Sequence, residues 1–514
     1  MSRRQVAVLV GLGAIALTAS YPPFPLPFLS FFAIAPAVLL LQQAVRDASP
    51  RAAFRWGWWY GLVSNALVLY WMVVALWHFT PLSALGYLAT IAVLGLLTGL
   101  MFWFVVRIRL AAPAVPLMLV LPVAWTALEW LVGHLGDVRF PWLGLGTSLA
   151  DAPILVQWAD IAGARGVTLW LAWCNVALVE AAMDVRGARY LVRGYASVLV
   201  TVLLALGYGV WRVKTLPLRD LGVAGLVQPN EGFREKWDPA HADSVVATLI
   251  DGSRQLAPEF PRPQLIIWPE AAIPDLLWRR PQWEARITAL VRETHVPIFT
   301  GAVWADSTYR SRLDPYYNAA LFIDTTGEWR KYPVYAKHYL VPVTERVPFV
   351  PVGVFRAIPG LRNWSGGFTP GRDLPLYKSA LGQFGVIVCY ESAFEDLPRK
   401  YRAEGANFLV NITNDAWFGR TSAPRQHASH LIMRAIETRM GVARAANSGI
   451  SEFVDPMGRT YAATKLDEKT FVSGVIRTTD VIPLYVRLGD WVGLLVVVLT
   501  LTGIVFLVKR RLRP

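Results

Sequence analysis

The chain has 514 residues, of which 54% are hydrophobic and only 17% are charged. Soluble globular chains carry about 25% charged residues, so this composition argues against an ordinary soluble protein. The formal net charge is +14, and the basic residues gather at the ends of apolar stretches. This placement indicates membrane topology and argues against a surface for nucleic acid.

Apolar stretches dominate the first two fifths of the chain and return at its end. A helix needs about 20 apolar residues to cross a bilayer. The sequence predicts eight such spans, the first of them short, at residues 6–20, 26–45, 57–78, 83–106, 114–134, 167–183, 194–211 and 489–508.

The charges between these spans alternate. Every second connection is basic, with arginines such as Arg46, Arg107 and Arg186, whereas Tyr21–Pro25 and Phe79–Leu82 carry no charge. Basic residues near span ends face the cytoplasm. We therefore expect both termini in the cytoplasm and the long segment after the seventh span outside it. A polybasic patch for anionic lipids would explain the clustering of the charges but not their alternation.

The composition divides the chain into three parts. Residues 1–212 form a predicted membrane domain of seven spans, residues 213–488 a predicted extracytoplasmic domain, and residues 489–514 an eighth span with a basic tail. In the middle part, short apolar runs alternate with amphipathic segments, which indicates a layered α/β or α+β domain. Periodicity does not decide between one sheet and two. Predicted strands are 222–228, 264–268, 296–302, 319–324, 385–390 and 407–414, and predicted helices are 281–294 and 425–440.

Three short segments in this domain carry reactive groups. Glu270 directly follows a predicted buried strand and Pro269, and burial would raise its pKa and make it a plausible general base. Lys337 lies between aromatic residues ahead of Leu340-Val341-Pro342, where it could stabilise an oxyanion. Taken alone, each residue has a structural alternative: Glu270 as a carboxylate at a helix start, and Lys337 as a lysine in a surface loop.

Cys389 ends the apolar run that begins at Phe384. The other cysteine, Cys174, lies inside a predicted span, so Cys389 has no evident disulfide partner. A thiol at the end of a strand is a candidate nucleophile, because a thiolate attacks carbonyl carbon once a base takes its proton. A buried structural cysteine is the alternative.

Taken together and in order, the three segments are more specific. Trp268-Pro269-Glu270, then Lys337 with Leu340-Val341-Pro342, then Cys389-Tyr390-Glu391-Ser392 resemble the nitrilase and carbon–nitrogen hydrolase superfamily. With seven spans before them and one after, the whole chain resembles the bacterial apolipoprotein N-acyltransferase family. The segments 123–130, 140–142 and 411–419 belong to the same resemblance.

The resemblance implies a fold and roles for individual residues. It implies a bundle of membrane helices carrying a nitrilase-like αββα sandwich, with Glu270 as general base, Lys337 as oxyanion stabiliser and Cys389 as nucleophile. Glu345 and Glu391 fall on the positions of accessory glutamates. One departure is visible: Val343-Thr344 stands where the family usually has Phe-Gly, which puts the backbone at Thr344 and the aim of Glu345 in question.

The resemblance also implies a reaction. A phospholipid would give its sn-1 acyl chain to Cys389 as a thioester, and the free amine of a diacylglyceryl-cysteine at the N-terminus of an apolipoprotein would accept it. No cofactor, metal or nucleic acid is expected, and the partners are the two lipid substrates and the surrounding membrane lipids. We expect a monomer in the bacterial inner membrane with its catalytic domain in the periplasm.

Some further residues have weaker roles. Trp237, Tyr390, Trp417 and Phe418 are candidates for lining a lipid cleft, with ordinary packing as the alternative. His427 and His430 lie three apart on a predicted helix, but no further ligand set accompanies them, so we expect them to pack rather than to bind a metal.

Two other functions compete with the acyltransferase. A membrane-tethered amidase or nitrilase that hydrolyses a small amide would share the three reactive segments, but a soluble substrate does not require eight spans. A transporter would show paired charges deep in the spans, and the sequence contains no matched pair.

Overall fold

A computed structural model describes residues 1–24, 26–77, 83–183, 188–310, 314–350, 354 and 367–511. The chain forms two compact units. The first comprises Met1–Thr215 and Leu488–Pro514, and the second comprises Leu216–Arg487.

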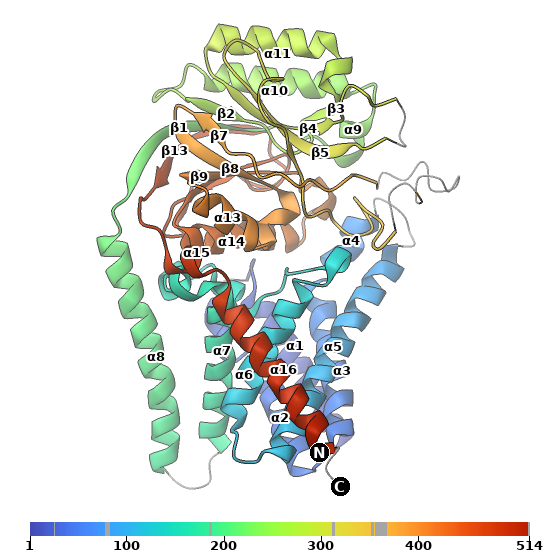
Figure 1. The fold of residues 1–514 in the computed structure, drawn as a ribbon, viewed down its shortest axis with the longest axis vertical. Helices are drawn as coiled ribbons and strands as arrows, with labels where there is room; N and C mark the ends of the chain where they lie inside the picture. Colours follow the sequence, from blue (N-terminus) through green and yellow to red (C-terminus); the bar gives the residue numbers. More distant parts are fainter. Residues whose placement is uncertain are drawn as a thin grey trace. The chain divides into compact units, whose positions relative to one another are not determined.

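The first unit is helical (Figure 1). Its α-helices are α1 (Arg3–Ser20), α2 (Ala35–Arg46), α3 (Pro50–Val68), α4 (Trp71–Trp77), α5 (Ser83–Ala111), α6 (Leu117–Val132), α7 (Ala159–Met183), α8 (Ala188–Thr215) and α16 (Trp491–Arg511).

Several of these helices are long and apolar enough to cross a membrane. Five segments qualify by length and composition among the described residues, or six if the bent pair α3–α4, with an angle of 58°, is one span. The predicted spans 6–20 and 114–134 fold as α1 and α6, which fall outside this count; α6 has only 16 residues. The count of eight spans and their orientation stay predictions, and the connections at 79–82 and Arg186 lie outside the described residues.

Glycines let α3 and α5 approach closely. A Cβ at Gly57 would lie 2.6 Å from the Phe102 ring, and one at Gly61 would lie 2.5 Å from Thr98 Oγ1. Small residues of this kind let the backbones of two apolar helices pack closely. Such packing replaces the hydrophobic driving force, which does not favour helix association within lipid.

The second unit contains two sheets. The seven-stranded sheet has the order β13-β1-β2-β4-β5-β6, with β3 paired to β4, and the six-stranded sheet has the order β12-β11-β10-β9-β8-β7. The strands are β1 (Arg219–Gln228), β2 (Leu265–Ile267), β3 (Ile273–Leu276), β4 (Ile298–Trp304), β5 (Tyr317–Ile323), β6 (Tyr335–Ala336), β7 (Tyr377–Ser379), β8 (Gly382–Val388), β9 (Phe408–Thr413), β10 (Gly441–Ala446), β11 (Glu452–Val454), β12 (Thr460–Tyr461) and β13 (Thr470–Thr478).

Helices cover the outer face of each sheet (Figure 1). α10 (Ala242–Leu256) and α11 (Pro281–Thr294) pack on the seven-stranded sheet, and α13 (Asp396–Ala403) and α14 (Ala423–Thr438) on the six-stranded one. Aromatic side chains fill the space between the sheets, with the Phe299 and Phe384 ring centroids 5.2 Å apart. Short helices α9 (Phe233–Trp237) and α15 (Leu484–Leu488) complete the unit. The nitrilase-like α/β fold expected from the resemblance is therefore confirmed.

Parallel pairing in both sheets sets the position of the reactive segments. β1, β2 and β4 run parallel in one sheet, and β8, β9 and β10 in the other. Glu270 follows the carboxyl end of β2, Cys389 that of β8 and Asn414 that of β9. Ligands in α/β proteins bind beyond the carboxyl ends of parallel strands. The hydrogen bond from the Asn414 backbone N–H to Glu270 Oε2 shows that these ends of the two sheets lie together.

Candidate active site

Glu270 is held by a tight approach of two backbones. A Cβ at Gly301 of β4 would lie 2.6 Å from Glu270 Cα, so only glycine fits there. The following residue, Ala271, has φ 46°, in the left-handed region that residues with a Cβ rarely occupy. The Glu270 side chain is 7% exposed. This backbone therefore fixes the direction in which Glu270 points.

Three donors hold the Glu270 carboxylate. Asn318 Nδ2 donates to Oε1 at 2.7 Å and Lys337 Nζ donates to the same oxygen at 3.2 Å. The backbone N–H of Asn414 donates to Oε2 at 2.9 Å. These three donors fix the orientation of the carboxylate, with two of them on Oε1 and one on Oε2.

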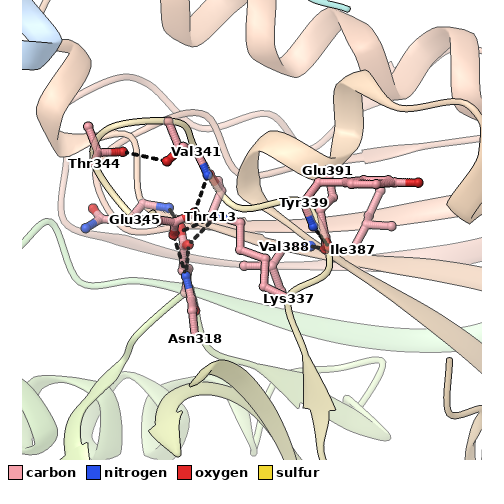
Figure 2. A network of polar contacts seen from close by, with 12 residues as sticks. Asn318, Lys337, Tyr339, Val341, Thr344, Glu345, Ile387, Val388, Glu391 and Thr413 are labelled. Atoms are coloured by element: carbon pink, nitrogen blue, oxygen red, sulfur yellow. Dashed lines mark hydrogen bonds and ion pairs between the residues drawn. The ribbon is translucent and has the colours of Figure 1, made fainter. Parts of the chain in front are cut away.

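Lys337 joins Glu270 to Glu345. Its Nζ lies 2.9 Å from Glu345 Oε1, and Asn318 Nδ2 donates to that same oxygen at 2.9 Å. Figure 2 shows Lys337 and Asn318 directed toward Glu345. Burial by itself lowers the pKa of Lys337, but the charges of Glu270 and Glu345 outweigh it and raise that pKa well above its ordinary value. The two carboxylates therefore favour the ammonium form of Lys337.

Cys389 sits at a sharp turn. β8 runs from Gly382 to Val388, so the predicted strand 385–390 begins three residues late and ends two residues late. Cys389 opens a 3-10 turn with φ 51°. The side chain is 1% exposed. Burial and the charge of Glu270 raise the pKa of the Cys389 thiol well above its ordinary value, and Lys337 opposes them. These surroundings favour the thiol over the thiolate, so Cys389 would need a base to act as a nucleophile.

Glu391 binds the segment that carries Lys337. Its Oε1 accepts from the backbone N–H groups of His338 and Tyr339 at 2.6 and 3.1 Å. Its Oε2 accepts from Tyr335 Oη and from the backbone N–H of Val388, both at 2.6 Å. Burial raises the pKa of Glu391. This carboxylate ties the Lys337 segment to the end of β8 and does not contact Lys337 by a hydrogen bond in the described residues.

The Val343-Thr344 departure leaves the aim of Glu345 intact. The left-handed residue is Val343, with φ 71°, and not Thr344. The backbone N–H of Val341 donates to Glu345 Oε2 at 2.8 Å, while that of Val343 donates to the carbonyl of Arg346 at 2.7 Å. The turn closes on itself, and Glu345 still reaches Lys337.

The aromatic candidates separate by exposure. Tyr390 and Phe418 are buried, and the Phe418 ring packs edge-on against His427 with centroids 5.9 Å apart. Trp417 is half-buried. Trp237, the last residue of α9, is 43% exposed. Trp237 is therefore the most exposed of the four aromatic candidates.

One cluster beside the cysteine has metal-binding residue types. Ligand atoms of Cys389, Asp415 and His427 lie within 4.8 Å of one another. The guanidinium of Arg444 donates to Asp415 Oδ2 at 2.8 Å and lies 3.2 Å from His427 Nδ1. Burial raises the pKa of Asp415, but His427 and Arg444 outweigh it and lower that pKa to about 2. Because Arg444 already neutralises Asp415 and would repel a cation, these residues fit an ion-pair network better than a metal site.

Sequence reasoning missed three polar residues at this site. Asn318 bridges Glu270 and Glu345, and its only signal is a polar residue near the start of an otherwise apolar strand. Lys236 is 2% exposed and donates from Nζ to the backbone carbonyl of Glu270 at 2.6 Å. Its neighbours Glu235 and Trp237 give no sign of burial. Asn414 acts through its backbone, which a side-chain motif does not reveal.

Known proteins resemble this chain along nearly its full length. Residues 13–177 match the apolipoprotein N-acyltransferase N-terminal domain, and residues 223–483 match the carbon–nitrogen hydrolase domain. An apolipoprotein N-acyltransferase from Geobacter metallireducens is 32% identical over 504 residues, which are 95% of this chain and 92% of the relative. Another from Methylococcus capsulatus is 32% identical over 516 residues, covering 98% of this chain and 97% of the relative.

Solved structures resemble part of the chain. An amidase from a Nesterenkonia species is 18% identical with a TM-score of 0.38, over 53% of this chain and 95% of the amidase. The matches in sequence are the stronger finding, and they confirm the resemblance drawn from the three reactive segments. The chain belongs to the apolipoprotein N-acyltransferase family, and its second unit is a carbon–nitrogen hydrolase domain.

Proposed function

We propose that this protein transfers the sn-1 acyl chain of a phospholipid to the free α-amino group of a diacylglyceryl-cysteine at the N-terminus of apolipoproteins. Glu270 is the general base, Lys337 stabilises the oxyanions and Cys389 carries the acyl chain. The observation that supports this most is the single buried group formed by Glu270, Asn318, Lys337 and Glu345, with the thiol of Cys389 within reach of the charges of Glu270 and Lys337.

The first half of the reaction loads the enzyme. Glu270 takes the proton of the Cys389 thiol, and the thiolate attacks the carbonyl carbon of the ester. The carbonyl oxygen gains a negative charge, which the ammonium of Lys337 stabilises. The bond from carbon to the glycerol oxygen then breaks, Glu270 returns the proton to that oxygen, and a lysophospholipid leaves. A thioester on Cys389 stays behind.

The second half of the reaction transfers the acyl chain from Cys389 to the acceptor. The neutral amine of the acceptor attacks the thioester carbon while Glu270 takes a proton from the nitrogen. The second oxyanion again lies beside Lys337, and its collapse breaks the carbon–sulfur bond. Glu270 protonates the sulfur, so the enzyme returns to its starting state and the amide is released. One base and one cation thus serve both halves.

The membrane helices suit two substrates that are themselves lipids. A site held at the membrane surface meets both by lateral diffusion, and a covalent intermediate lets one site use them in turn. We propose that the protein lies in the bacterial inner membrane with seven spans before the catalytic domain and one after it. The catalytic domain is on the periplasmic side, both termini are cytoplasmic and the protein acts as a monomer.

A burst experiment tests the proposed reaction. Purified protein mixed with phospholipid and no acceptor should release about one lysophospholipid per enzyme and then stop, since the thioester waits for an amine. Adding a diacylated lipopeptide with a free N-terminal amine should restart release, and the same lipopeptide with an acetylated amine should not. Continued release of free fatty acid without acceptor, or of ammonia from a small amide, would contradict the proposal and favour the hydrolase.

A further inference from the structure

A second lysine reaches the proposed active site. Lys236 of α9 is almost fully buried, and its ammonium donates to the backbone carbonyl of Glu270 at 2.6 Å. The charged or titratable groups that face it are Glu231 on its own segment, Glu270 after β2 and Cys389 after β8. It therefore hydrogen-bonds the backbone of the proposed base and interacts electrostatically with the proposed nucleophile.

The two lysines are held differently. Lys337 bonds two carboxylates, whereas Lys236 has a neutral carbonyl as the partner that the structure gives it. Burying an ammonium without a carboxylate hydrogen bond is costly. Such a cost is characteristic of groups kept for function rather than for stability.

Hydrogen bonds of Asn447 connect the segment before Lys236 to Asn414, which binds the Glu270 carboxylate. Asn447 Oδ1 accepts from the backbone N–H of Glu231 at 3.0 Å, and its Nδ2 donates to the carbonyl of Glu231 at 2.7 Å. The same Nδ2 donates to Asn414 Oδ1 at 3.0 Å, and the backbone N–H of Asn414 binds the Glu270 carboxylate. Lys236 thus hydrogen-bonds the Glu270 backbone, and Asn414 hydrogen-bonds its side chain. Asn447 connects the segment of Lys236 to Asn414.

We infer that Lys236 is a positioning residue for the proposed acyl transfer, which fixes the backbone of Glu270 and supplies a second positive charge while Glu270 and Cys389 exchange a proton. This inference rests on the proposed function. In this proposal the Lys236 ammonium stabilises the negative charge while that charge moves between the Glu270 carboxylate and the Cys389 sulfur. Removing the ammonium should therefore slow acylation more than it destabilises the fold.

The charge of Lys236 should be visible in the pH dependence. Burial lowers the pKa of Lys236 to about 8, opposed by Glu270, Glu231 and Cys389. The pKa values of Lys337 and Cys389 are raised well above their ordinary values, so neither loses its proton near that pH. Above about pH 8 the second charge disappears, and the rate of acylation should fall.

Single-turnover acylation isolates this step, because the acceptor amine also titrates near neutrality. The mass gain of the enzyme with phospholipid alone is followed from about pH 6 to about pH 10 in wild type, Lys236→Met, Lys236→Arg and the exposed control Lys378→Met. Wild type and Lys378→Met should show a fall centred near pH 8. Lys236→Met should be about 10-fold slower or more at neutral pH and lack the fall. Lys236→Arg should keep more of the rate and stay flat to higher pH.

The outcomes separate this inference from the proposed function. Lys236→Met with the wild-type rate and the same fall near pH 8 would overturn it, as would a wild type without that fall. If Lys236→Met does not fold, the wild-type and Lys236→Arg profiles decide the matter alone. A wild type that never gains an acyl group would overturn the proposed function itself, and this inference with it.

Discussion

The surroundings of Cys389, the proposed nucleophile, favour the protonated thiol. Burial raises the pKa of the Cys389 thiol most, the charges of Glu270 and Asp415 raise it further, and the positive charge of Lys337 opposes them. Many reactive cysteines instead lie in electropositive surroundings and are thiolates before the substrate arrives. In the proposed mechanism the thiol must lose its proton before it attacks, so the rate of acylation should depend on the base.

The base can be tested by one isosteric change. Glu270→Gln keeps the shape of the side chain and an acceptor for Asn318 but cannot take a proton. Acylation by phospholipid should slow by about 10²- to 10⁴-fold. The exposed control Glu468→Gln should keep the wild-type rate, and the mass gain of the enzyme over time measures both. Equal acylation rates in Glu270→Gln and wild type would remove Glu270 from the mechanism.

The element that most constrains the site is the segment from Tyr335 to Glu345. It is not regular secondary structure beyond the two residues of β6, so its shape comes from side chains that accept its backbone N–H groups. Glu391 holds one end and Glu345 the other, and Lys337 lies between them, as Figure 2 shows. The two accessory glutamates thus build the loop that aims the cation.

Removing charge from Glu391 should loosen this element. In Glu391→Gln one of the two acceptor oxygens becomes an amide nitrogen facing donors, which leaves buried N–H groups unbonded. A loss of about 3 kcal/mol is expected, seen as an unfolding temperature lowered by roughly 5 °C or more. The exposed control Glu404→Gln should unfold like wild type. An unchanged unfolding temperature in Glu391→Gln would show that Glu391 does not anchor the loop.

The sequence predicted the strands that bear the site better than the contacts that complete it. The helix at 281–294 was predicted with its observed bounds, since proline starts it and its apolar spacing is regular. The helix predicted at 425–440 begins two residues earlier, at Ala423. β13 was not predicted, because its pairing with β1 joins segments about 250 residues apart and local pattern does not report such pairing. Lys236 and Asn318 were missed for the same reason: their roles come from residues distant in sequence.

At the scale of the whole molecule, the charge pattern predicts how the protein is oriented in the membrane. The alternation of basic connections predicts the catalytic domain outside the cytoplasm and the N-terminus inside. Ser307→Cys and Ser2→Cys, each in a Cys174→Ala, Cys389→Ala background, place single exposed thiols in the second unit and at the N-terminus. A membrane-impermeant maleimide should label Ser307→Cys in intact spheroplasts and Ser2→Cys only after lysis. Labelling in the reverse order would refute the predicted topology.

The most direct measurement is the intact mass of the purified protein after incubation with phospholipid and no acceptor. The proposed mechanism predicts a gain of one acyl group, removed by neutral hydroxylamine as thioesters are, present in wild type and absent in Cys389→Ala. It is contradicted if Cys389→Ala gains the same acyl group, or if wild type transfers acyl chains to a lipopeptide without ever gaining one.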